Sequence, residues 1–292
     1  MYTGERVVVE RDLDSNLVDQ VVDLARDAGK AIVRIYDADE FDVAQKHDDS
    51  PLTAADMAAH RVLVAGLASI LPGVPILSEE SAVPDFVTRQ SWRRYWIIDP
   101  LDGTKEFIGR NGEFTVNVAL VDDGVPILGV VHVPVSGVTY VGVYEQGAFK
   151  FDGRGEKMPI SCRSMEGRGQ NNKPVAVVAS RRHGAGAVDD LLAGLSDRLG
   201  VVETCNMGSS LKLCLVAEGE ADLYPRLAPT MEWDTAAAQA VVEAAGGVVL
   251  DTRFDVVRYN TKDDLLNPFF YVVGDPQFPW RDLIGARQPK TL

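Results

Sequence analysis

The sequence predicts an α/β fold of layered helices and sheets, divided into two fused halves. Its 292 residues exceed what a single hydrophobic core usually holds. Residues 114–151 read as apolar strands joined by tight turns, which is typical of an antiparallel meander. Residues 175–245 alternate strand and helix patterns, as βαβ units do. We therefore expect an antiparallel-sheet half at residues 1–155 and an α/β half at residues 156–292.

The composition is that of an ordinary globular protein with an acidic balance. Hydrophobic residues make up 46% and charged residues 25% of the chain, and the formal net charge is -14. A chain this acidic is not expected to bind duplex nucleic acid through a broad surface that faces phosphates. A small anionic ligand remains compatible with it, because a bound cation can reverse the local field.

Cysteine use and hydropathy indicate a cytoplasmic protein. The three cysteines, Cys162, Cys205 and Cys214, lack the close-paired spacing of a metal site, and their odd number fits reduced thiols. The sequence has no run of about eighteen apolar residues, and the apolar run near its start is too short for a signal peptide. We expect a cytoplasmic address, with peripheral attachment at the inner membrane left open.

The first half is expected to begin with two helices. Apolar residues at helical spacing predict a helix over residues 17–35, with Asp14 or Ser15 as its N-cap. Residues 53–56 have the form of a capping box ahead of a second helix that runs to residue 71. Strands are then expected at residues 76–78, 95–99, 114–121, 125–135, 138–144 and 148–151.

The second half is expected to alternate strands with helices. Residues 163–173 are polar and are predicted to form a linker or a flexible loop. Strands are expected at residues 175–179, 201–204, 221–224, 248–250 and 270–273, and helices at residues 187–199, 209–217 and 233–245. The residues after Pro276 are predicted to be a loosely held tail.

Residues 95–107 carry the main chemical signal. Pro100 cannot donate a ladder hydrogen bond, so it is expected to end the strand that leads into it. Asp99 and Asp102 then lie three apart on a bend, with the Leu101 carbonyl between them. Mg²⁺ prefers oxygen ligands, and two carboxylates this close repel each other unless a cation lies between them. The bend therefore predicts a metal site, while the same residue types also form ordinary surface turns.

A phosphate site is expected directly after this bend. Gly103 and Thr104 lie where a helix should begin, and the unpaired N–H groups of a helix start favour an anion. Two more acidic residues stand at element ends, because Glu79 closes a strand and Asp234 opens a helix. Such carboxylates can hold two or three Mg²⁺ ions on one phosphate for an in-line displacement. Asp234 and Asp56 also fit the plainer role of helix caps.

Three ordered motifs make the sequence recognisable. The stretches LSEES at residues 77–81, WIIDPLDGT at 96–104, and WDTAA at 233–237 with EAAGG at 243–247 closely resemble those of the inositol monophosphatase-like superfamily. Within it, SPLTAAD at residues 50–56, KEFI at 105–108, RNGEFTVN at 110–117 and GSSLK at 208–212 are similar to the bacterial 3'(2'),5'-bisphosphate nucleotidases. The similarity spans residues 15–275.

This resemblance implies a fold and a reaction. The fold is an αβαβα sandwich, and the reaction is Mg²⁺-dependent removal of the 3'-phosphate from adenosine 3',5'-bisphosphate, a by-product of sulfate activation, to give AMP. Thr104, oriented by Asp56, would position the attacking water. The first metal would be held by Glu79, Asp99 and the Leu101 carbonyl, the second by Asp99, Asp102 and Asp234, and a third by Glu79 with water.

The resemblance also assigns substrate contacts. The amides of Gly103 and Thr104 would hold the phosphate that is cleaved. The nucleoside and its 5'-phosphate would be contacted by Ser180, His183, Gly208, Ser209, Lys212 and Arg226. Sensitivity to Li⁺ and a homodimer are further expectations. Two positions depart from the family pattern: Ala238 stands where glycine is common, and Glu232 is expected to add negative charge near the site.

Other functions remain open at this point. Inositol 1-phosphate or fructose 1,6-bisphosphate could be the substrate on the same scaffold, although residues 104–106 favour the nucleotide. An aspartyl-phosphate hydrolase of the haloacid dehalogenase type also places Asp, Gly and Thr after a strand, but its two aspartates lie two apart rather than three. A metal or nucleotide sensor without catalysis would not need a threonine that positions water.

Overall fold

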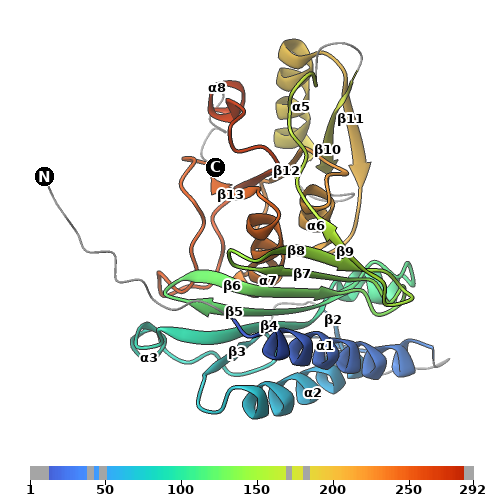
Figure 1. Cartoon of the computed structure of the whole chain (residues 1–292), viewed down its shortest axis with the longest axis vertical. Helices are drawn as coiled ribbons and strands as arrows, with labels where there is room; N and C mark the ends of the chain where they lie inside the picture. The colour runs from blue at the N-terminus through green and yellow to red at the C-terminus, as the bar shows by residue number, and fades with distance from the viewer. Residues whose placement is uncertain (1–12, 38–42, 46–50, 169–172, 180–184, 286–292) are drawn as a thin grey trace, which may run out of the picture.

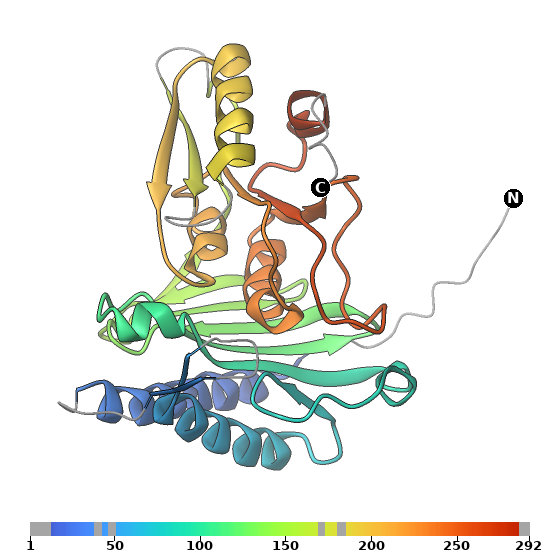
Figure 2. The same ribbon diagram turned by 180° about the vertical axis from the view of Figure 1, so that it is seen from behind.

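Helices and sheets alternate in layers through the molecule, as Figures 1 and 2 show. The structure is a computed structural model that describes residues 13–37, 43–45, 51–168, 173–179 and 185–285. Two long helices are followed by a seven-stranded sheet, a middle layer of helices, a five-stranded sheet and an outer pair of helices. The predicted α/β class and the αβαβα sandwich are thereby confirmed.

Helices α1 (Ser15–Tyr36) and α2 (Ala54–Ile70) form the first layer. The Asp14 side chain accepts a hydrogen bond from the Asn16 amide at 3.2 Å, so the N-cap prediction is confirmed. A two-stranded antiparallel ladder of β1 (Val43–Gln45) and β2 (Pro51–Thr53) lies between them in the chain. The face of α1 that packs into the core consists of Val18, Val21, Val22, Ala25, Ala28, Gly29, Ile32 and Tyr36.

The first sheet is a meander that follows the chain order. Its strands are β3 (Ile76–Ser78), β4 (Arg94–Asp102), β5 (Thr115–Asp122), β6 (Val125–His132), β7 (Thr139–Val143), β8 (Gly147–Phe151) and β9 (Lys157–Ile160). Only β3 and β4 are parallel, and the antiparallel meander is confirmed. Strand β9 was not predicted, because three of its four side chains are exposed and it lacks the apolar run of its neighbours.

The prediction that Pro100 ends the strand is wrong. Strand β4 continues to Asp102, and its pairing with β5 shifts register between Asp99 and Asp102. Asp99 pairs with Asn117 and Asp102 with Thr115, so β4 carries one extra residue there. A bulge of this kind leaves a residue without a ladder hydrogen bond, which is how the strand accommodates a proline.

Helix α7 (Glu232–Ala244) packs on the other face of this sheet at very short range. A Cβ added at Gly129 would lie 2.0 Å from the Ala237 carbonyl oxygen, and one added at Gly142 would lie 2.4 Å from that of Ala240. Only glycine allows the helix backbone to come this close to the sheet. The first turn of α7 is thereby brought to the end of β4 where Asp99 lies.

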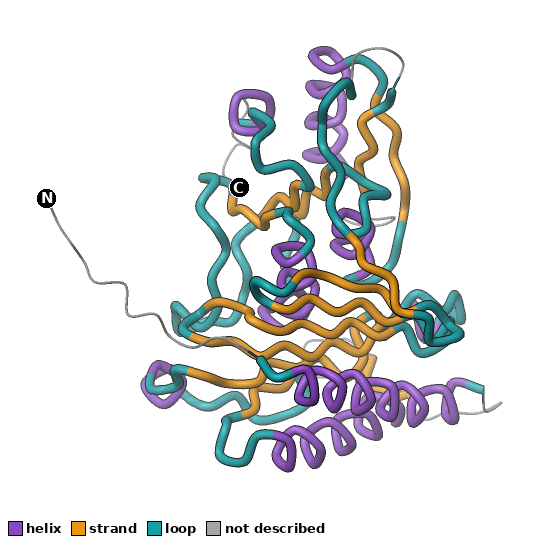
Figure 3. The backbone as a smooth tube through the Cα atoms, viewed as in Figure 1, coloured by secondary structure: helices purple, strands orange, loops and turns teal. Residues whose placement is uncertain are grey.

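The second sheet has five strands of mixed direction, coloured orange between helices in Figure 3. In spatial order they are β11 (Val202–Asn206), β10 (Val175–Ala179), β12 (Leu223–Arg226), β14 (Phe270–Val273) and β13 (Val248–Asp251). Strands β10, β11 and β12 are parallel, which confirms the βαβ prediction. The helices of this half are α5 (Ala185–Leu199), α6 (Leu211–Ala217), α7 and α8 (Trp280–Ile284).

The prediction of a loosely held tail after Pro276 is wrong for the residues that the structure describes, and the predicted linker is anchored by side-chain contacts. Trp280 of α8 is buried with 2% exposure, and its indole N–H donates to the Asp275 carbonyl at 3.0 Å, so residues 277–285 dock on the core, while residues 286–292 lie outside the described part of the chain. In the predicted linker, the described residues 163–168 and 173 form no helix or strand, and Arg163 makes two hydrogen bonds to the buried Asp222 carboxylate, at 2.6 and 2.8 Å. The sequence hid both, because single aromatic and charged side chains make these contacts without any periodic pattern.

Two short helices, α3 (Phe86–Gln90) and α4 (Thr104–Ile108), flank β4. The division of the chain at residue 155 stays a prediction.

Among the described helices, none combines the length and the apolar character needed to cross a membrane.

Candidate active site

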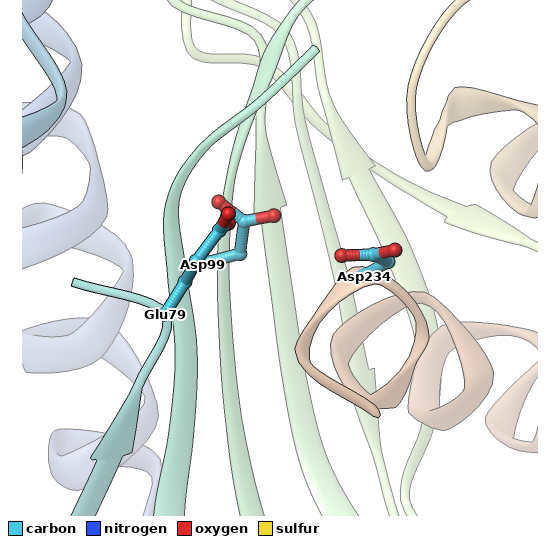
Figure 4. A group of neighbouring side chains, drawn as sticks. All are labelled: Glu79, Asp99 and Asp234. Carbon is cyan, nitrogen blue, oxygen red and sulfur yellow. The ribbon is translucent and has the colours of Figure 1, made fainter. Parts of the chain in front are cut away.

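Three carboxylates from distant parts of the sequence converge at one end of the first sheet. Glu79 follows β3, Asp99 lies in β4, and Asp234 lies in the first turn of α7. One oxygen from each lies within 4.8 Å of the others. Figure 4 shows Glu79 beside Asp99, with Asp234 facing them from the helix. Parallel pairing of Ser78 with Ile98 explains why Glu79 and Asp99 emerge side by side.

The cluster is electrostatically crowded. Asp99 is 1% exposed, and burial, followed by the charges of Glu79, Asp102 and Asp234, raises the pKa of Asp99 well above its usual value. Burial and then the Asp102 charge likewise raise the pKa of Asp234. The hydrogen bond that Asp234 accepts from the Met231 amide lowers this pKa and opposes them in part. A divalent cation would relieve this repulsion, and the donors are the hard oxygens that Mg²⁺ prefers. The residues present therefore fit a metal site.

Asp102 borders this cluster and also binds a distant loop. Its Oδ2 accepts hydrogen bonds from the Ser210 amide, at 2.6 Å, and from the Ser209 hydroxyl. The Leu101 amide donates to Asp99 Oδ1 at 3.0 Å, which fixes the bend between the two aspartates. Asp99, Leu101 and Asp102 thus lie together as the sequence analysis expected.

The two residues predicted to activate water both lie in the first turn of a helix. Thr104 is the first residue of α4, behind Gly103, whose φ of +94° suits glycine. Asp56 is fully buried in the first turn of α2, and its charge contributes to the raised pKa of Asp99. Asp56 therefore faces the carboxylate cluster from the first helical layer.

The loop at residues 207–210 is anchored by polar contacts that the sequence analysis did not assign. The Gly208 amide donates to Glu113 Oε2 at 2.7 Å, and a Cβ at Gly208 would lie 2.9 Å from the Glu113 carbonyl oxygen. The Ser209 hydroxyl lies 2.6 Å from the Thr115 hydroxyl, with Ser209 in the left-handed region at φ +50°. Within RNGEFTVN at residues 110–117, the polar positions inside an apolar strand were the available signal.

Lys212 and Arg226 both hold backbone carbonyls near this loop. The buried Lys212 ammonium donates to the carbonyls of Met207, at 3.3 Å, and Ser209, at 2.6 Å. An ammonium has three N–H donors, so one remains for a ligand. Burial lowers the pKa of Lys212 to about 8, partly opposed by the Asp102 charge. Arg226 donates to the Ala228 and Pro229 carbonyls at 3.2 and 3.0 Å and keeps further N–H groups.

A cavity of about 390 Å³ joins these groups. Its lining includes Asp102, Gly103, Lys105, Glu106, Gly109, Asn111, Met207, Gly208, Ser209, Ser210, Lys212, Leu213, Tyr224, Arg226, Thr230, Asp234, Thr235 and Phe270. Two of the predicted metal ligands, Asp102 and Asp234, thus share one cavity with the cationic side chains of Lys212 and Arg226. The sequence analysis did not place Lys105, Glu106 or Asn111 there. Ser180 and His183, predicted to contact the nucleoside, lie outside the described residues.

The two departures from the family pattern are both buried in the structure. Ala238 is fully buried in α7. Glu232 accepts hydrogen bonds from the Asn260 amide on both carboxylate oxygens, at 3.0 and 2.9 Å, and its neighbouring charges are Lys262, Arg89 and Asp264. Burial raises the pKa of Glu232 to about 7. The expectation that Glu232 adds charge to the site is wrong, because its carboxylate faces the loop at residues 260–264.

Comparison with known proteins places the chain among phosphatases. The sequence model of the inositol monophosphatase family matches residues 14–272. The 3'(2'),5'-bisphosphate nucleotidase CysQ of Escherichia coli K12 is 49% identical over 257 residues, which cover 88% of this chain and 99% of that protein. CysQ of Haemophilus influenzae is 35% identical, covering 93% and 97% respectively.

Solved structures give the same picture. The crystal structure of CysQ from Bacteroides thetaiotaomicron superposes with a TM-score of 0.79 at 42% identity, covering 90% of this chain and 98% of that one. The suhB extragenic suppressor protein of Bartonella henselae shares the fold at a TM-score of 0.72 and 24% identity, covering 95% and 100% respectively.

Proposed function

The chain belongs to the inositol monophosphatase family, and we propose that it is a Mg²⁺-dependent 3'(2'),5'-bisphosphate nucleotidase. Its substrate is adenosine 3',5'-bisphosphate, and its products are AMP and phosphate. The observation that carries this proposal is the shared cavity, which has carboxylates at Asp102 and Asp234 and cations at Lys212 and Arg226. A substrate with two phosphates can place one against each group.

The metal ligands in this proposal are the carboxylates of Glu79, Asp99, Asp102 and Asp234 with the Leu101 carbonyl. Two or three bound Mg²⁺ ions would supply charge neutralisation and a lowered pKa for a water molecule. Asp56 orients Thr104 and accepts its hydroxyl proton as Thr104 Oγ1 takes a proton from the attacking water. As the water oxygen bonds to phosphorus, the bond from phosphorus to the 3'-oxygen breaks, and the 3'-oxygen takes a proton from solvent to give the 3'-hydroxyl of AMP. The amides of Gly103 and Thr104 hold the phosphate in line during this step.

A comparison of substrates tests this assignment. Initial rates with Mg²⁺ are measured on adenosine 3',5'-bisphosphate, inositol 1-phosphate and fructose 1,6-bisphosphate. We expect kcat/KM for the nucleotide to exceed the other two by at least about 100-fold, since a site built for a second phosphate and a base rejects ligands that leave it unpaired. A higher value for inositol 1-phosphate would assign the protein to the inositol monophosphatases proper.

Replacing Lys212 with alanine separates the two phosphate sites. We expect KM for adenosine 3',5'-bisphosphate to rise at least about tenfold more than KM for adenosine 3'-monophosphate, because only the former carries a 5'-phosphate for the free N–H of Lys212. Steady-state kinetics on both substrates provide the measurement. Equal increases would remove Lys212 from the 5'-phosphate site and leave it as an anchor of residues 207–210.

The lowered pKa of Lys212 predicts a pH dependence. The ammonium is charged below its pKa of about 8 and neutral above it. We therefore expect kcat/KM for the bisphosphate to fall above about pH 8, roughly tenfold per pH unit until it reaches the value of a variant without this charge, because kcat/KM reports the free enzyme. In Lys212→Met the kcat/KM is expected to be lower and to lack this limb. An unchanged limb in that variant would assign the ionisation to another group.

The remaining expectations belong to the same proposal. The enzyme acts in the cytoplasm, in sulfate assimilation, as a homodimer that Li⁺ inhibits. Sedimentation velocity reports the dimer, and inhibition of turnover by LiCl but not by KCl reports the Li⁺ effect.

A further inference from the structure

The buried side chain of Arg89 links two segments that are far apart in the sequence. Arg89 lies on α3, between the end of β3 that carries Glu79 and the start of β4. It is 1% exposed, and among the described residues its hydrogen-bond acceptors are Asn260 and the carbonyls of Pro84 and Asp263. Its Nε donates to the Pro84 carbonyl at 3.0 Å, which closes α3 onto the preceding loop. A buried Arg is costly unless its donors are satisfied, so its partners indicate what it holds.

Those partners lie about 170 residues later in the sequence. Arg89 donates from Nη1 to Asn260 Oδ1 at 2.6 Å and from Nη2 to the Asp263 carbonyl. The Asn260 side-chain N–H in turn donates a hydrogen bond to the main-chain carbonyl of Arg89 at 2.7 Å. Figure 1 shows the loop after β13 descending to the edge of the first sheet, on the side where α3 lies. Arg89 and Asn260 thus join that loop to the segment that begins at Glu79.

The same loop also holds the start of α7. The Asn260 amide donates to both carboxylate oxygens of Glu232, which is 2% exposed. Glu232 is the first residue of α7, two positions before Asp234. A continuous set of hydrogen bonds therefore connects the segment that carries Glu79 to the helix turn that carries Asp234.

The metal cluster needs such a connection. Glu79 and Asp234 belong to different elements, and their charges, with those of Asp99 and Asp102, repel at short range. Repulsion alone would move the first turn of α7 away from β4. The buried Arg89 guanidinium is well suited to resist this displacement. It is planar and always charged, and its N–H donors have a fixed geometry.

We propose that Arg89, Asn260 and Glu232 form a positioning clamp that holds Asp234 at metal-binding distance from Glu79 and Asp99. None of the three binds the cation or the substrate, and the clamp acts through Asp234. The inference rests on the proposed metal-dependent function, and it adds residues that set the affinity for the divalent cation.

The structure offers a variant that cuts this clamp without disturbing the backbone. Asn260 has φ +55°, so Asn260→Gly is compatible with its conformation. That change removes the two hydrogen bonds between the Asn260 side chain and Arg89. It keeps the main-chain N–H of residue 260, which donates a hydrogen bond to Glu232. Arg89→Lys keeps the positive charge but loses the several N–H donors that the guanidinium directs at its partners. Arg163→Lys is a matched control, because Arg163 likewise uses its guanidinium to hold a distant segment, through two hydrogen bonds to Asp222, but lies in the other half of the chain.

The test is direct Mg²⁺ binding to the full-length protein by isothermal titration calorimetry, alongside turnover and thermal unfolding. We expect Asn260→Gly and Arg89→Lys to raise the Mg²⁺ Kd by about 10-fold or more, as loss of residues that orient metal ligands does. At saturating Mg²⁺ the substrate KM should stay within about twofold, and Arg163→Lys should bind Mg²⁺ like the wild type.

Three results would overturn the clamp: an unchanged Mg²⁺ Kd in folded Asn260→Gly, an equal rise in Arg163→Lys, or a wild-type protein that binds no Mg²⁺. A wild-type protein that binds Mg²⁺ but does not hydrolyse adenosine 3',5'-bisphosphate would instead reject the proposed function. In that case the Kd values of the variants still decide whether the clamp exists.

Discussion

Asp99→Asn is expected to lower kcat/KM by more than about 100-fold while the metal-free protein remains folded. Residues that only orient metal ligands contribute about 10–100-fold, and Asp99 is a proposed direct ligand of two ions. Its carboxylate is buried among like charges, so a neutral amide should remove repulsion in the absence of metal. We therefore expect the Tm in EDTA to equal or exceed that of the wild type.

Kinetics with Mg²⁺ and thermal unfolding in EDTA measure the two effects. Asp123→Asn is the matched control, because it removes the same charge from an exposed turn whose φ of +53° asparagine tolerates. The control should keep both the wild-type rate and the wild-type Tm. If folded Asp99→Asn retains a wild-type rate, Asp99 does not hold a catalytic metal.

Gly129→Ala is expected to be the most damaging substitution of a single small residue. A Cβ there would lie 2.0 Å from the Ala237 carbonyl oxygen, and neither the β6 backbone nor the α7 backbone is the flexible end of a side chain. Overpacking of a core costs about 1–3 kcal/mol when side chains can shift, and here a whole helix must move. We expect Tm to fall by more than about 5 °C.

Activity should fall with stability, since Asp234 moves with α7. The comparison variant is Gly186→Ala on the exposed surface of α5, where nothing lies within 4 Å of an added Cβ. Alanine favours a helix over glycine by about 1 kcal/mol, so that variant should be neutral or slightly more stable. Wild-type Tm and activity in Gly129→Ala would show that the helix and the sheet are not as close as the structure has them.

The sequence predicted the parts of the fold that depend on local pattern. Apolar runs between turn residues placed β5 to β8, and element boundaries singled out Glu79 and Asp99, which only the resemblance put on one metal. Asp234 joined this group only through the resemblance of its motif. No local pattern relates a helix start at residue 232 to a strand end at residue 99, because the close approach depends on Gly129 and Gly142.

Contacts between distant single residues were the part that could not be predicted. Pro100 was expected to end a strand, but a bulge opposite Thr115 and Asn117 absorbs it. Glu232 looked like an added charge in the site, whereas its partner Asn260 lies in a loop without any periodic signal. Long-range hydrogen bonds of this kind leave no spacing in the sequence for an analysis to detect.

The central claim is that acidic residues far apart in the sequence jointly bind the divalent cation used in hydrolysis. Anomalous diffraction from a crystal soaked in Mn²⁺ tests it most directly. We expect a peak within metal–oxygen bonding distance, about 2.0–2.6 Å, of carboxylate oxygens of Glu79, Asp99 and Asp234. Strong Mn²⁺ peaks elsewhere, with none among these three carboxylates, would contradict the account.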